Sequence, residues 1–493
     1  MSLINVSNLT FCYDGSYDNI FENVSFSIDT DWKLGFIGRN GRGKTTFLKL
    51  LLSKYEHSGK ITKSVNFDYF PFEVKNKAKT SLEIAEKIHP EFELWQLNRE
   101  ISLLKLSEEI LNRPFESLSN GEQTKLLLAI LFLKDNNFLL IDEPTNHLDF
   151  ESRQTVSEYL NRKNGFILIS HDRSFLDSCV DHILSINLTN IEVQRGNFSS
   201  WWQNKEFQAN FELSENEKLK KDISRLHESA KQSAEWSDKV EATKYGGKRA
   251  SGLKPDRGFV GHKAAKMMKR SKSAESRKNK AIEEKSKLLK NVEVAEDLKL
   301  NPLIHHQNNL VEISDLSIFY GEKVVCKNIN FVVNTGSRIA LKGRNGCGKS
   351  SILKLIWGGN IETSGTINVA NNLKISYVSQ DTSELSGNLT EFAKIHNIGE
   401  SLFKAILRKL DFSRVQFEKD ISEFSEGQKK KFLIAKSLCE SAHLYIWDEP
   451  LNFIDVLSRM QIEELILKYK PTLLFVEHDK MFIEKIADHI VEI

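Results

Sequence analysis

The stretch GRNGRGKT runs from Gly38 to Thr45 and decides the fold of the first part of the chain. It follows a short apolar run, KLGFI, and precedes a helical pattern, TFLKLLL. Strand, glycine-rich loop and helix are the order that phosphate binding needs, because glycines let backbone N–H groups turn inward around a β-phosphate. We expect Lys44 to neutralise the β- and γ-phosphates and Thr45 to hold Mg²⁺.

A second such stretch, GRNGCGKS, runs from Gly343 to Ser350 between RIALK and SILKLIW. Two matches in the same strand–loop–helix context exclude a chance occurrence. The predicted nucleotide-binding residues of the two loops are Gly38, Asn40, Gly41, Gly43, Lys44, Thr45, Thr46, Gly343, Asn345, Gly346, Gly348, Lys349, Ser350 and Ser351.

Further features recur at nearly the same distance along the chain. The serines of LSNGEQTK and FSEGQKKK are 306 residues apart, and so are the glutamates of IDEPTNHLD and WDEPLNFID. The histidines of LISHDRSF and FVEHDKMF are 307 residues apart. A constant offset indicates an internal duplication, with domains at about residues 1–204 and 303–493.

The acidic pairs of the repeated motif predict the hydrolytic chemistry. Asp142 and Asp448 end apolar runs that are typical of buried parallel strands, so each is expected beside its phosphate loop, where it can hold Mg²⁺. Glu143 and Glu449 come next and are placed to polarise the attacking water.

Two other repeated side chains are predicted to touch the nucleotide. His171 and His478 each follow a further apolar strand, and we expect them to contact the γ-phosphate. Tyr13 and Tyr320, 307 residues apart, are predicted to stack on adenine. The alternative for the tyrosines is a place in the core at a strand edge.

SNGEQ and SEGQ are predicted to open helices. A serine and a glycine at a helix N-terminus offer backbone donors to an anion. Since each phosphate loop already has its own ligands, these motifs make most sense facing the nucleotide of the opposite domain. The residues concerned are Ser119, Gly121, Glu122, Ser425, Gly427 and Gln428.

Composition excludes several classes of protein. The chain has 493 residues, so two or three domains are expected. No apolar run reaches the roughly 18 residues that span a bilayer, and the first residues do not read as a signal peptide. The five cysteines are scattered and form no CxxC pair, which favours a reduced, cytoplasmic setting.

Residues 205–302 predict a helical hairpin linker. Residues 205–240 contain no proline or glycine, and Met267, Ala274, Ala281 and Leu288 recur every seven residues, a coiled-coil period. Glycines and a proline between these arms predict a tip at about residues 242–262. A floppy linker and a helix pair packed on the other domains are the alternatives.

The tip and the start of the second arm are strongly basic. Residues 244–280 hold 13 Lys and Arg residues against 2 Asp and Glu residues, although the net charge of the whole chain is only +2. A single sign over such a length favours a polyanionic partner. The predicted contacts with RNA are Lys244, Tyr245, Lys248, Arg249, Lys254, Arg257, Phe259 and Lys263.

These motifs resemble those of the ATP-binding cassette (ABC) superfamily. The resemblance implies an α/β fold of two tandem ABC-type ATPase domains that pair head to tail within one chain, with ATP and Mg²⁺ as cofactors. Each composite site would join the loop of one cassette to the signature motif, SNGEQ or SEGQ, of the other. Gln380 resembles the glutamine of the Q-loop and is a further predicted Mg²⁺ ligand. Phe72 stands at the matching place in the first cassette and cannot hold a metal, so unequal hydrolysis is expected.

Two cassettes joined by a basic helical linker resemble the ABC-F proteins of translation. DWKLGFIGRNGRGKTT, AEWS and LYIWDEPLN are similar to Lsa-type resistance members. The resemblance implies an ATPase that enters the E site of the 70S ribosome, approaches 23S rRNA and the P-site tRNA, and displaces lincosamides, streptogramins A and pleuromutilins. A housekeeping translation factor and a fused ATPase subunit of a membrane importer are the alternatives; no membrane subunit is expected, and the protein is predicted to be monomeric.

Overall fold

The computed structural model of the chain describes residues 2–13, 19–134, 137–146, 148–187, 190–242, 298–321 and 323–493, together with His262, Lys266, Lys269 and Ser276. The chain divides into two compact units. One contains residues 1–201 and 295–493, which hold both cassettes, and the other contains residues 202–294. No described helix is long and apolar enough to cross a membrane.

The first cassette is built on a largely parallel sheet. Its strand order is β5-β6-β7-β3-β8-β9, and only the last pair is antiparallel. The strands are β3 (Lys33–Ile37), β5 (Asn66–Phe70), β6 (Asn137–Asp142), β7 (Phe166–Ile169), β8 (His182–Asn187) and β9 (Asn190–Arg195). A separate antiparallel sheet, in the order β2-β1-β4, contains β1 (Leu3–Phe11), β2 (Phe21–Asp29) and β4 (Ser58–Thr62).

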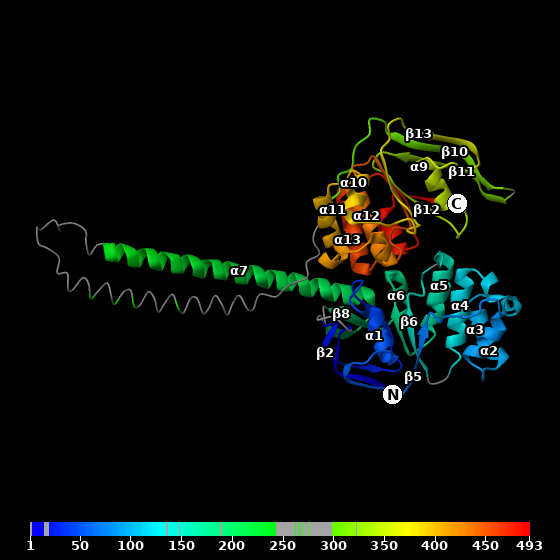
Figure 1. Ribbon diagram of the computed structural model, residues 1–493, viewed down its shortest axis with the longest axis horizontal. Coiled ribbons are helices and arrows are strands. Elements are labelled where there is room, and N and C mark those ends of the chain that lie inside the picture. Colours follow the sequence, from blue (N-terminus) through cyan, green and yellow to red (C-terminus); the bar gives the residue numbers. More distant parts are fainter. Residues whose placement is uncertain are drawn as a thin grey trace, which may run out of the picture. The chain divides into compact units, whose positions relative to one another are not determined.

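Helices surround this sheet. They are α1 (Lys44–Leu51), α2 (Ser81–Ile88), α3 (Leu94–Leu103), α4 (Asn120–Leu131), α5 (Phe150–Asn161) and α6 (Arg173–Cys179), with short 3₁₀ turns η1 (Glu108–Asn112) and η2 (Phe115–Ser117). Figure 1 shows α2, α3 and α4 gathered at one side of the cassette. Ser119 begins α4 through a capping box, in which its hydroxyl accepts from the N–H of Glu122.

The second cassette repeats this plan. Its parallel sheet has the order β14-β15-β16-β12-β17, and its antiparallel sheet has the order β11-β10-β13. The strands are β10 (Asn309–Tyr320), β11 (Lys323–Asn334), β12 (Arg338–Lys342), β13 (Thr363–Val369), β14 (Ile375–Val378), β15 (Leu444–Asp448), β16 (Leu473–Val476) and β17 (His489–Glu492). The helices are α9 (Lys349–Trp357), α10 (Leu389–Ile395), α11 (Glu400–Lys409), α12 (Glu426–Cys439), α13 (Val456–Tyr469) and α14 (Lys480–Ile486), with 3₁₀ turns η3 (Arg414–Glu418) and η4 (Ile421–Glu423). The duplication inferred from the constant offset is therefore present in the strand order.

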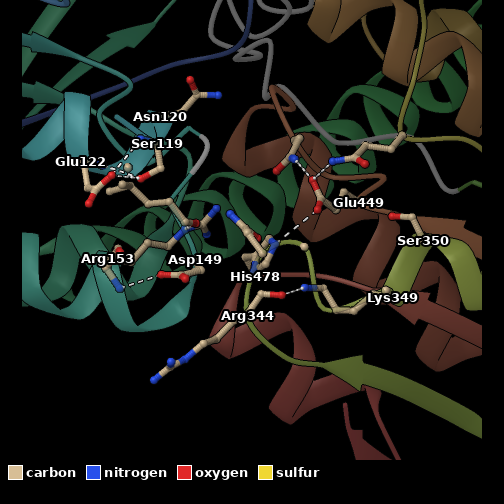
Figure 2. A pocket seen from close by; sticks show the side chains of 18 of the residues that line it. Ser119, Asn120, Glu122, Asp149, Arg153, Arg344, Lys349, Ser350, Glu449 and His478 are labelled. Carbon is tan, nitrogen blue, oxygen red and sulfur yellow. Dashed lines mark hydrogen bonds and ion pairs between the residues drawn. The ribbon is translucent and has the colours of Figure 1, made fainter. Parts of the chain in front are cut away.

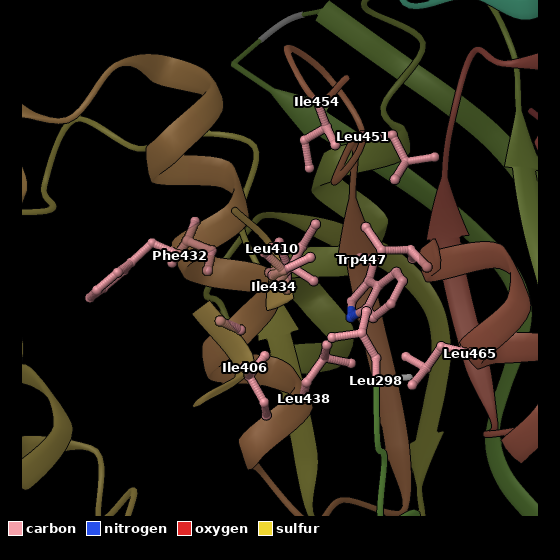
Figure 3. Close-up of a cluster of buried hydrophobic side chains, with 14 of the residues drawn as sticks. Leu298, Ile406, Leu410, Phe432, Ile434, Leu438, Trp447, Leu451, Ile454 and Leu465 are labelled. Atoms are coloured by element: carbon pink, nitrogen blue, oxygen red, sulfur yellow. The ribbon is translucent and has the colours of Figure 1, made fainter. Parts of the chain in front are cut away.

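The apolar runs before Asp142 and Asp448 form the interior strands β6 and β15, each the second strand of its sheet. Both strands are buried and lie parallel to their neighbours. Residues Tyr445 and Trp447 of β15 belong to a cluster of buried side chains that also contains Leu298 and Leu300, where the chain re-enters the second cassette. Figure 3 shows Leu298 and Trp447 within this cluster, with Leu438 and Leu465 nearby. Leu298 and Leu300 therefore anchor the chain in the core of the second cassette at the point where the linker ends.

The linker begins as one long helix. Helix α7 runs from Phe198 to Ala242, 45 residues, so it starts seven residues before the predicted first arm. At about 1.5 Å per residue it extends roughly 68 Å. Phe207 and Phe211, four residues apart, are both exposed. The predicted tip contacts at 244–263 and the heptad residues of the second arm lie outside the described residues. Residues 298–300, within the predicted helical linker, are not helical.

Candidate functional site: two ATP sites

Both phosphate loops adopt the turn that their glycines were predicted to make. Gly43 and Gly348, which directly precede α1 and α9, have φ values of 91° and 99°, in the left-handed region. A Cβ at Gly43 would lie 2.5 Å from Ile20 Cγ2, so only glycine fits there. Each loop lysine is buried: the ammonium of Lys44 donates to the carbonyl of Gly38 (2.6 Å), and that of Lys349 to the carbonyl of Gly343 (2.8 Å).

The loop hydroxyls and the aspartates at the strand ends lie together in both cassettes. Thr45 Oγ1 donates to Asp142 Oδ2 at 2.8 Å, and Ser350 Oγ donates to Asp448 Oδ1 at 3.0 Å. Asp448 Oδ2 is buried and, among the described residues, has no hydrogen-bond partner. Burial raises the pKa of Asp448 to about 6. A hydroxyl and a carboxylate oxygen are the hard ligands that Mg²⁺ prefers, so these pairs fit the ion.

The two glutamates are held in a strained conformation. Glu143 and Glu449 have φ values of 52° and 48°, which non-glycine residues rarely adopt and which occur at functional sites. The backbone N–H of each donates to the neighbouring strand, to Ile169 O (2.9 Å) and to Val476 O (3.0 Å). The duplicated geometry directs both carboxylates toward the loop side of the sheet.

Each glutamate lies beside the histidine of its own cassette that was predicted to contact the γ-phosphate. His171 Nε2 is 3.2 Å from Glu143 Oε1, and His478 Nε2 is 3.3 Å from Glu449 Oε1. Burial raises the pKa of Glu143 to about 8 and, with the positive charge of Lys44, lowers that of His171 well below its usual value. Burial also opposes ionisation of Glu449, yet the hydrogen bond with His478 holds its pKa below the ordinary value.

The second composite site encloses a cavity. A volume of about 990 Å³ lies between the start of α4 and the second phosphate loop. Figure 2 shows Ser119 and Glu122 on one side and Lys349, Ser350, Glu449 and His478 on the other. Gly121, Asn345, Gly346, Gly348, Ser351, Gln380 and Tyr320 also line it. The structure thus brings the signature motif of one cassette to the loop of the other, in a space of the size that ligands occupy.

At the first composite site the two cassettes are in direct contact. Asn40 Nδ2 donates to Phe453 O at 2.8 Å. A Cβ added at Gly427 would lie 3.1 Å from Asn40 Nδ2 and 2.5 Å from Phe453 O. Arg39 pairs with Asp411 at 2.8 Å. The signature motif that begins at Ser425 therefore meets the loop of the first cassette, through contacts closer than those at the second site.

The two predicted adenine tyrosines lie beside the loop helices. Tyr13 Oη is 2.7 Å from Thr46 Oγ1, and Tyr320 Oη is 3.0 Å from Ser351 Oγ. They are 42% and 53% exposed, so neither is a core residue. The Tyr13 ring also packs edge-on against Phe11 and Tyr55, with ring centroids 5.2 and 5.7 Å apart.

Several contacts of the site could not be read from the motifs. Gln380 Nε2 and Asn452 Nδ2 both donate to Glu449 Oε2, at 2.8 and 2.6 Å. Arg153 pairs with Asp172, and Arg459 with Asp479, at 3.0 and 3.2 Å. The arginines are 306 residues apart and the aspartates 307, so the constant offset could have found these pairs. Tyr69, whose hydroxyl donates to Asp142, also recurs, as Tyr377, but the repeat does not reveal this hydrogen bond.

Comparison with known proteins agrees with this geometry. The ABC transporter family model matches residues 21–146 and 326–452. Ribosome protection protein VmlR of Bacillus subtilis is 28% identical over 98% of this chain and 85% of its own length. ABC transporter F family member 2 of Arabidopsis thaliana is 25% identical over 99% of this chain and 76% of its own length.

A solved structure shares the fold. The complex of archaeal ribosomal stalk protein aP1 and ribosome recycling factor aABCE1 contains a chain that matches with a TM-score of 0.64 at 18% identity, covering 98% of this chain and 87% of that one. The similarity supports the arrangement of two cassettes. With the two matches of the family model, which together cover half of the sequence, it leads to one conclusion: the chain belongs to the ABC transporter family and is an ATP-binding ATPase with two cassettes.

Proposed function

We propose that this ATPase is an ABC-F ribosome protection protein. ATP binding joins the cassettes and permits entry into the E site of the 70S ribosome. There the linker reaches 23S rRNA and the P-site tRNA, and drugs of the peptidyl transferase centre leave. Hydrolysis then releases the protein. These steps place the protein in the cytoplasm, where ribosomes are found.

The observation that carries this proposal is the linker. Helix α7 is 45 residues long, and the segment that follows it holds 13 basic against 2 acidic residues between 244 and 280. Neutralising phosphates is the main sequence-independent contribution to RNA binding. A long helix that leads to a basic segment suits a probe of an RNA surface. The similarity to ribosome protection protein VmlR, which extends over nearly the whole chain, supports the proposed action on the ribosome.

The chemistry of each site follows from its residues. Lys44 and Lys349 bind the phosphates, while Thr45 with Asp142 and Ser350 with Asp448 would hold Mg²⁺. The bound ion would neutralise charge on the phosphate oxygens. Glu143 and Glu449 orient and polarise the attacking water. A hydrogen bond with His478 holds the Glu449 carboxylate, and His171 lies 3.2 Å from the carboxylate of Glu143. Gln380 is a further proposed contact of the second metal site.

The test is ribosome co-sedimentation of a Glu143→Gln, Glu449→Gln double variant with ATP. These changes keep the nucleotide contacts and remove the carboxylates, so the closed form accumulates. We expect the variant to pellet with 70S ribosomes only with ATP, and less at higher salt. A Lys44→Ala, Lys349→Ala variant, which lacks the phosphate-binding lysines, is the matched control. A double variant that stays in the supernatant at low salt would overturn the proposal.

Drug protection needs its own experiment. Replacing Lys244, Lys248, Arg249 and Lys254 by alanine removes positive charge from the proposed tip without touching the cassettes. We expect cells that carry this variant to lose resistance to lincosamides, streptogramins A and pleuromutilins, while the purified protein retains its ATPase activity without ribosomes. Full resistance in these cells would contradict a role of the tip.

A housekeeping translation factor is the second candidate. ATP-binding protein Uup of Buchnera aphidicola is 27% identical over 99% of this chain, almost the same degree of similarity as VmlR. Both functions use the same ATP sites, so the sites do not separate them. Drug susceptibility that is unchanged by overexpression, together with ATP-dependent ribosome binding, would favour this candidate.

A further inference from the structure

The Q-loops of the two cassettes begin at the same place in their sheets. Strand β5 pairs with β6 so that Phe70 is opposite Ile141, one residue before Asp142. Strand β14 pairs with β15 so that Val378 is opposite Trp447, one residue before Asp448. Phe72 and Gln380, each two residues farther on, therefore occupy matching positions.

These matching positions carry different chemistry. Gln380 donates to the carboxylate of Glu449 at 2.8 Å. Phe72 has no polar atom in its side chain and is 40% exposed. The first site therefore lacks the amide with which the second site holds Glu449.

A tyrosine supplies a donor in the first cassette. Tyr69 Oη donates to Asp142 Oδ2 at 2.9 Å, the same oxygen that accepts from Thr45 Oγ1 at 2.8 Å. Asp142 and Thr45 are the two protein groups that would hold Mg²⁺ in this site. The hydroxyl of Tyr69 thus acts on the orientation of a metal-ligating carboxylate.

The equivalent tyrosine of the second cassette does not make this bond. Tyr377 stands at the position in β14 that Tyr69 occupies in β5. Its hydroxyl is buried and, in the described part of the chain, has no partner, and neither does Asp448 Oδ2. The ring of Tyr377 stacks on Trp357, with centroids 5.0 Å apart and planes inclined by 18°.

The neighbours of the two rings explain the difference. Trp357 ends α9, and the first cassette has Leu52 after the corresponding helix α1. A leucine offers no stacking surface, and the ammonium of Lys54 lies 5.9 Å from the centre of the Tyr69 ring instead. The Tyr69 ring is therefore free to place its hydroxyl at Asp142.

We propose that Tyr69 is a positioning residue of the first ATP site, where its hydrogen bond to Asp142 orients the Mg²⁺-binding carboxylate. In the second site Gln380 holds Glu449 instead, and among the described residues Tyr377 forms no hydrogen bond with Asp448. The two ATP sites of the chain consequently hold the metal by different supporting contacts. Loss of a hydrogen bond to a metal-ligating side chain typically lowers metal affinity by about 10- to 100-fold. We expect a loss of that size when the Tyr69 hydroxyl is removed.

The test measures metal dependence at one site at a time. A Lys349→Ala background leaves only the first site able to bind nucleotide, and a Lys44→Ala background leaves only the second. Binding of a fluorescent ATP analogue to the full chain is titrated with Mg²⁺. Tyr69→Phe keeps the ring volume and removes only the hydroxyl, and Tyr377→Phe is its matched control in the other background. Melting temperatures confirm that both variants fold.

We expect Tyr69→Phe to raise the Mg²⁺ concentration for half-maximal binding by about 10- to 100-fold, without changing nucleotide binding in EDTA. Tyr377→Phe should change it by less than about twofold, because in the described part of the chain its hydroxyl forms no hydrogen bond. An unchanged or lower Mg²⁺ midpoint in Tyr69→Phe would overturn the proposal. Equal shifts in both variants would overturn it too, since the tyrosines would then act in the same way.

Discussion

Arg173 of the first cassette forms a buried ion pair with Glu463 of the second. Nη1 of the arginine lies 3.1 Å from Oε2 of the glutamate, and Nη2 contacts Oε1. The side chains are 4% and 0% exposed, and Lys485 also reaches Glu463 at 3.1 Å. Arg173 lies two residues after His171, so the pair ties the histidine segment of the first ATP site to the other cassette.

This ion pair exists on one side of the duplicated structure only. The residues that match Arg173 and Glu463 in the opposite cassettes are Lys480 and Ser157. Lys480 is exposed and lies near Glu484, and Ser157 contacts Ser178. A serine cannot form an ion pair. The two composite sites therefore differ in how firmly the cassettes are joined beside them.

Breaking this pair should destabilise the protein. Arg173→Ala leaves Glu463 buried with only Lys485 as a partner, and the free energy of unfolding should fall by about 3–5 kcal/mol. Lys480→Ala, which removes an exposed pair, should cost less than about 1 kcal/mol. Denaturant titration of both variants gives the comparison. Equal losses would show that the buried pair adds nothing beyond a surface contact.

The two ATP sites should respond differently to pH. Burial raises the pKa of Glu143 to about 8, so its carboxylate, the form that acts as a base, becomes the major form only above that pH. Turnover at the first site, measured in a Glu449→Gln variant, should rise as pH increases from about 6.5, pass half of its maximum near pH 8 and level off above about pH 9.

The second site is the control for this pH dependence. The hydrogen bond of Glu449 with His478 keeps its pKa below the usual value despite burial, so its carboxylate is ionised from neutral to alkaline pH. Turnover in a Glu143→Gln variant should change by less than about twofold between about pH 7 and about pH 9. Identical pH profiles at both sites would contradict the difference in ionisation.

Alanine at the two signature glycines should have unequal effects. At Gly427 the added carbon would lie 2.5 Å from Phe453 O, closer than real contacts, and would press on Asn40 of the other cassette. At Gly121 it would meet Leu148 at 3.6 Å, an ordinary contact. We expect Gly427→Ala to lower turnover at the first site by on the order of 10- to 100-fold. Gly121→Ala should lower turnover at the second site by less, with each site assayed in the background that silences the other.

The return of the chain into the second cassette should be sensitive to truncation. Leu300 is 1% exposed within the core around Trp447, so Leu300→Ala should reduce the free energy of unfolding by about 2–5 kcal/mol. Ile304, four residues later, is 86% exposed, and Ile304→Ala should have almost no effect. Thermal and denaturant unfolding of the two variants tests this. A similar loss in both would mean that the core does not depend on the re-entering leucines.

Much of each ATP site could be predicted because its signals are local. The loop geometry at Gly43 and Gly348 depends on neighbouring residues, and so do the capping boxes of Ser119 and Ser425. The constant offset then indicated that every such feature is present twice. The apolar runs before Asp142 and Asp448 predicted parallel strands, since such runs are typical of strands buried on both faces.

Other features depended on residues that are far apart in the chain. Tyr69 and Tyr377 are the same residue type at matching positions, yet only Tyr69 reaches its aspartate, because Trp357 stacks on the other ring. Arg173 and Glu463 are 290 residues apart, and neither lies in a repeated motif that pairs them. Helix α7 begins at Phe198, before the residue predicted from helical spacing.

The sequence by itself determined the duplication, the phosphate loops, the acidic residues beside them and the basic character of the linker. These properties reside in short segments whose conformation and charge depend on adjacent residues. Only the tertiary structure decided which cassette contacts which loop closely, and which hydroxyl meets a metal-binding carboxylate. Such contacts depend on the packing of side chains such as Trp357 and Glu463 against distant elements, and distances across the fold are not encoded in any local pattern.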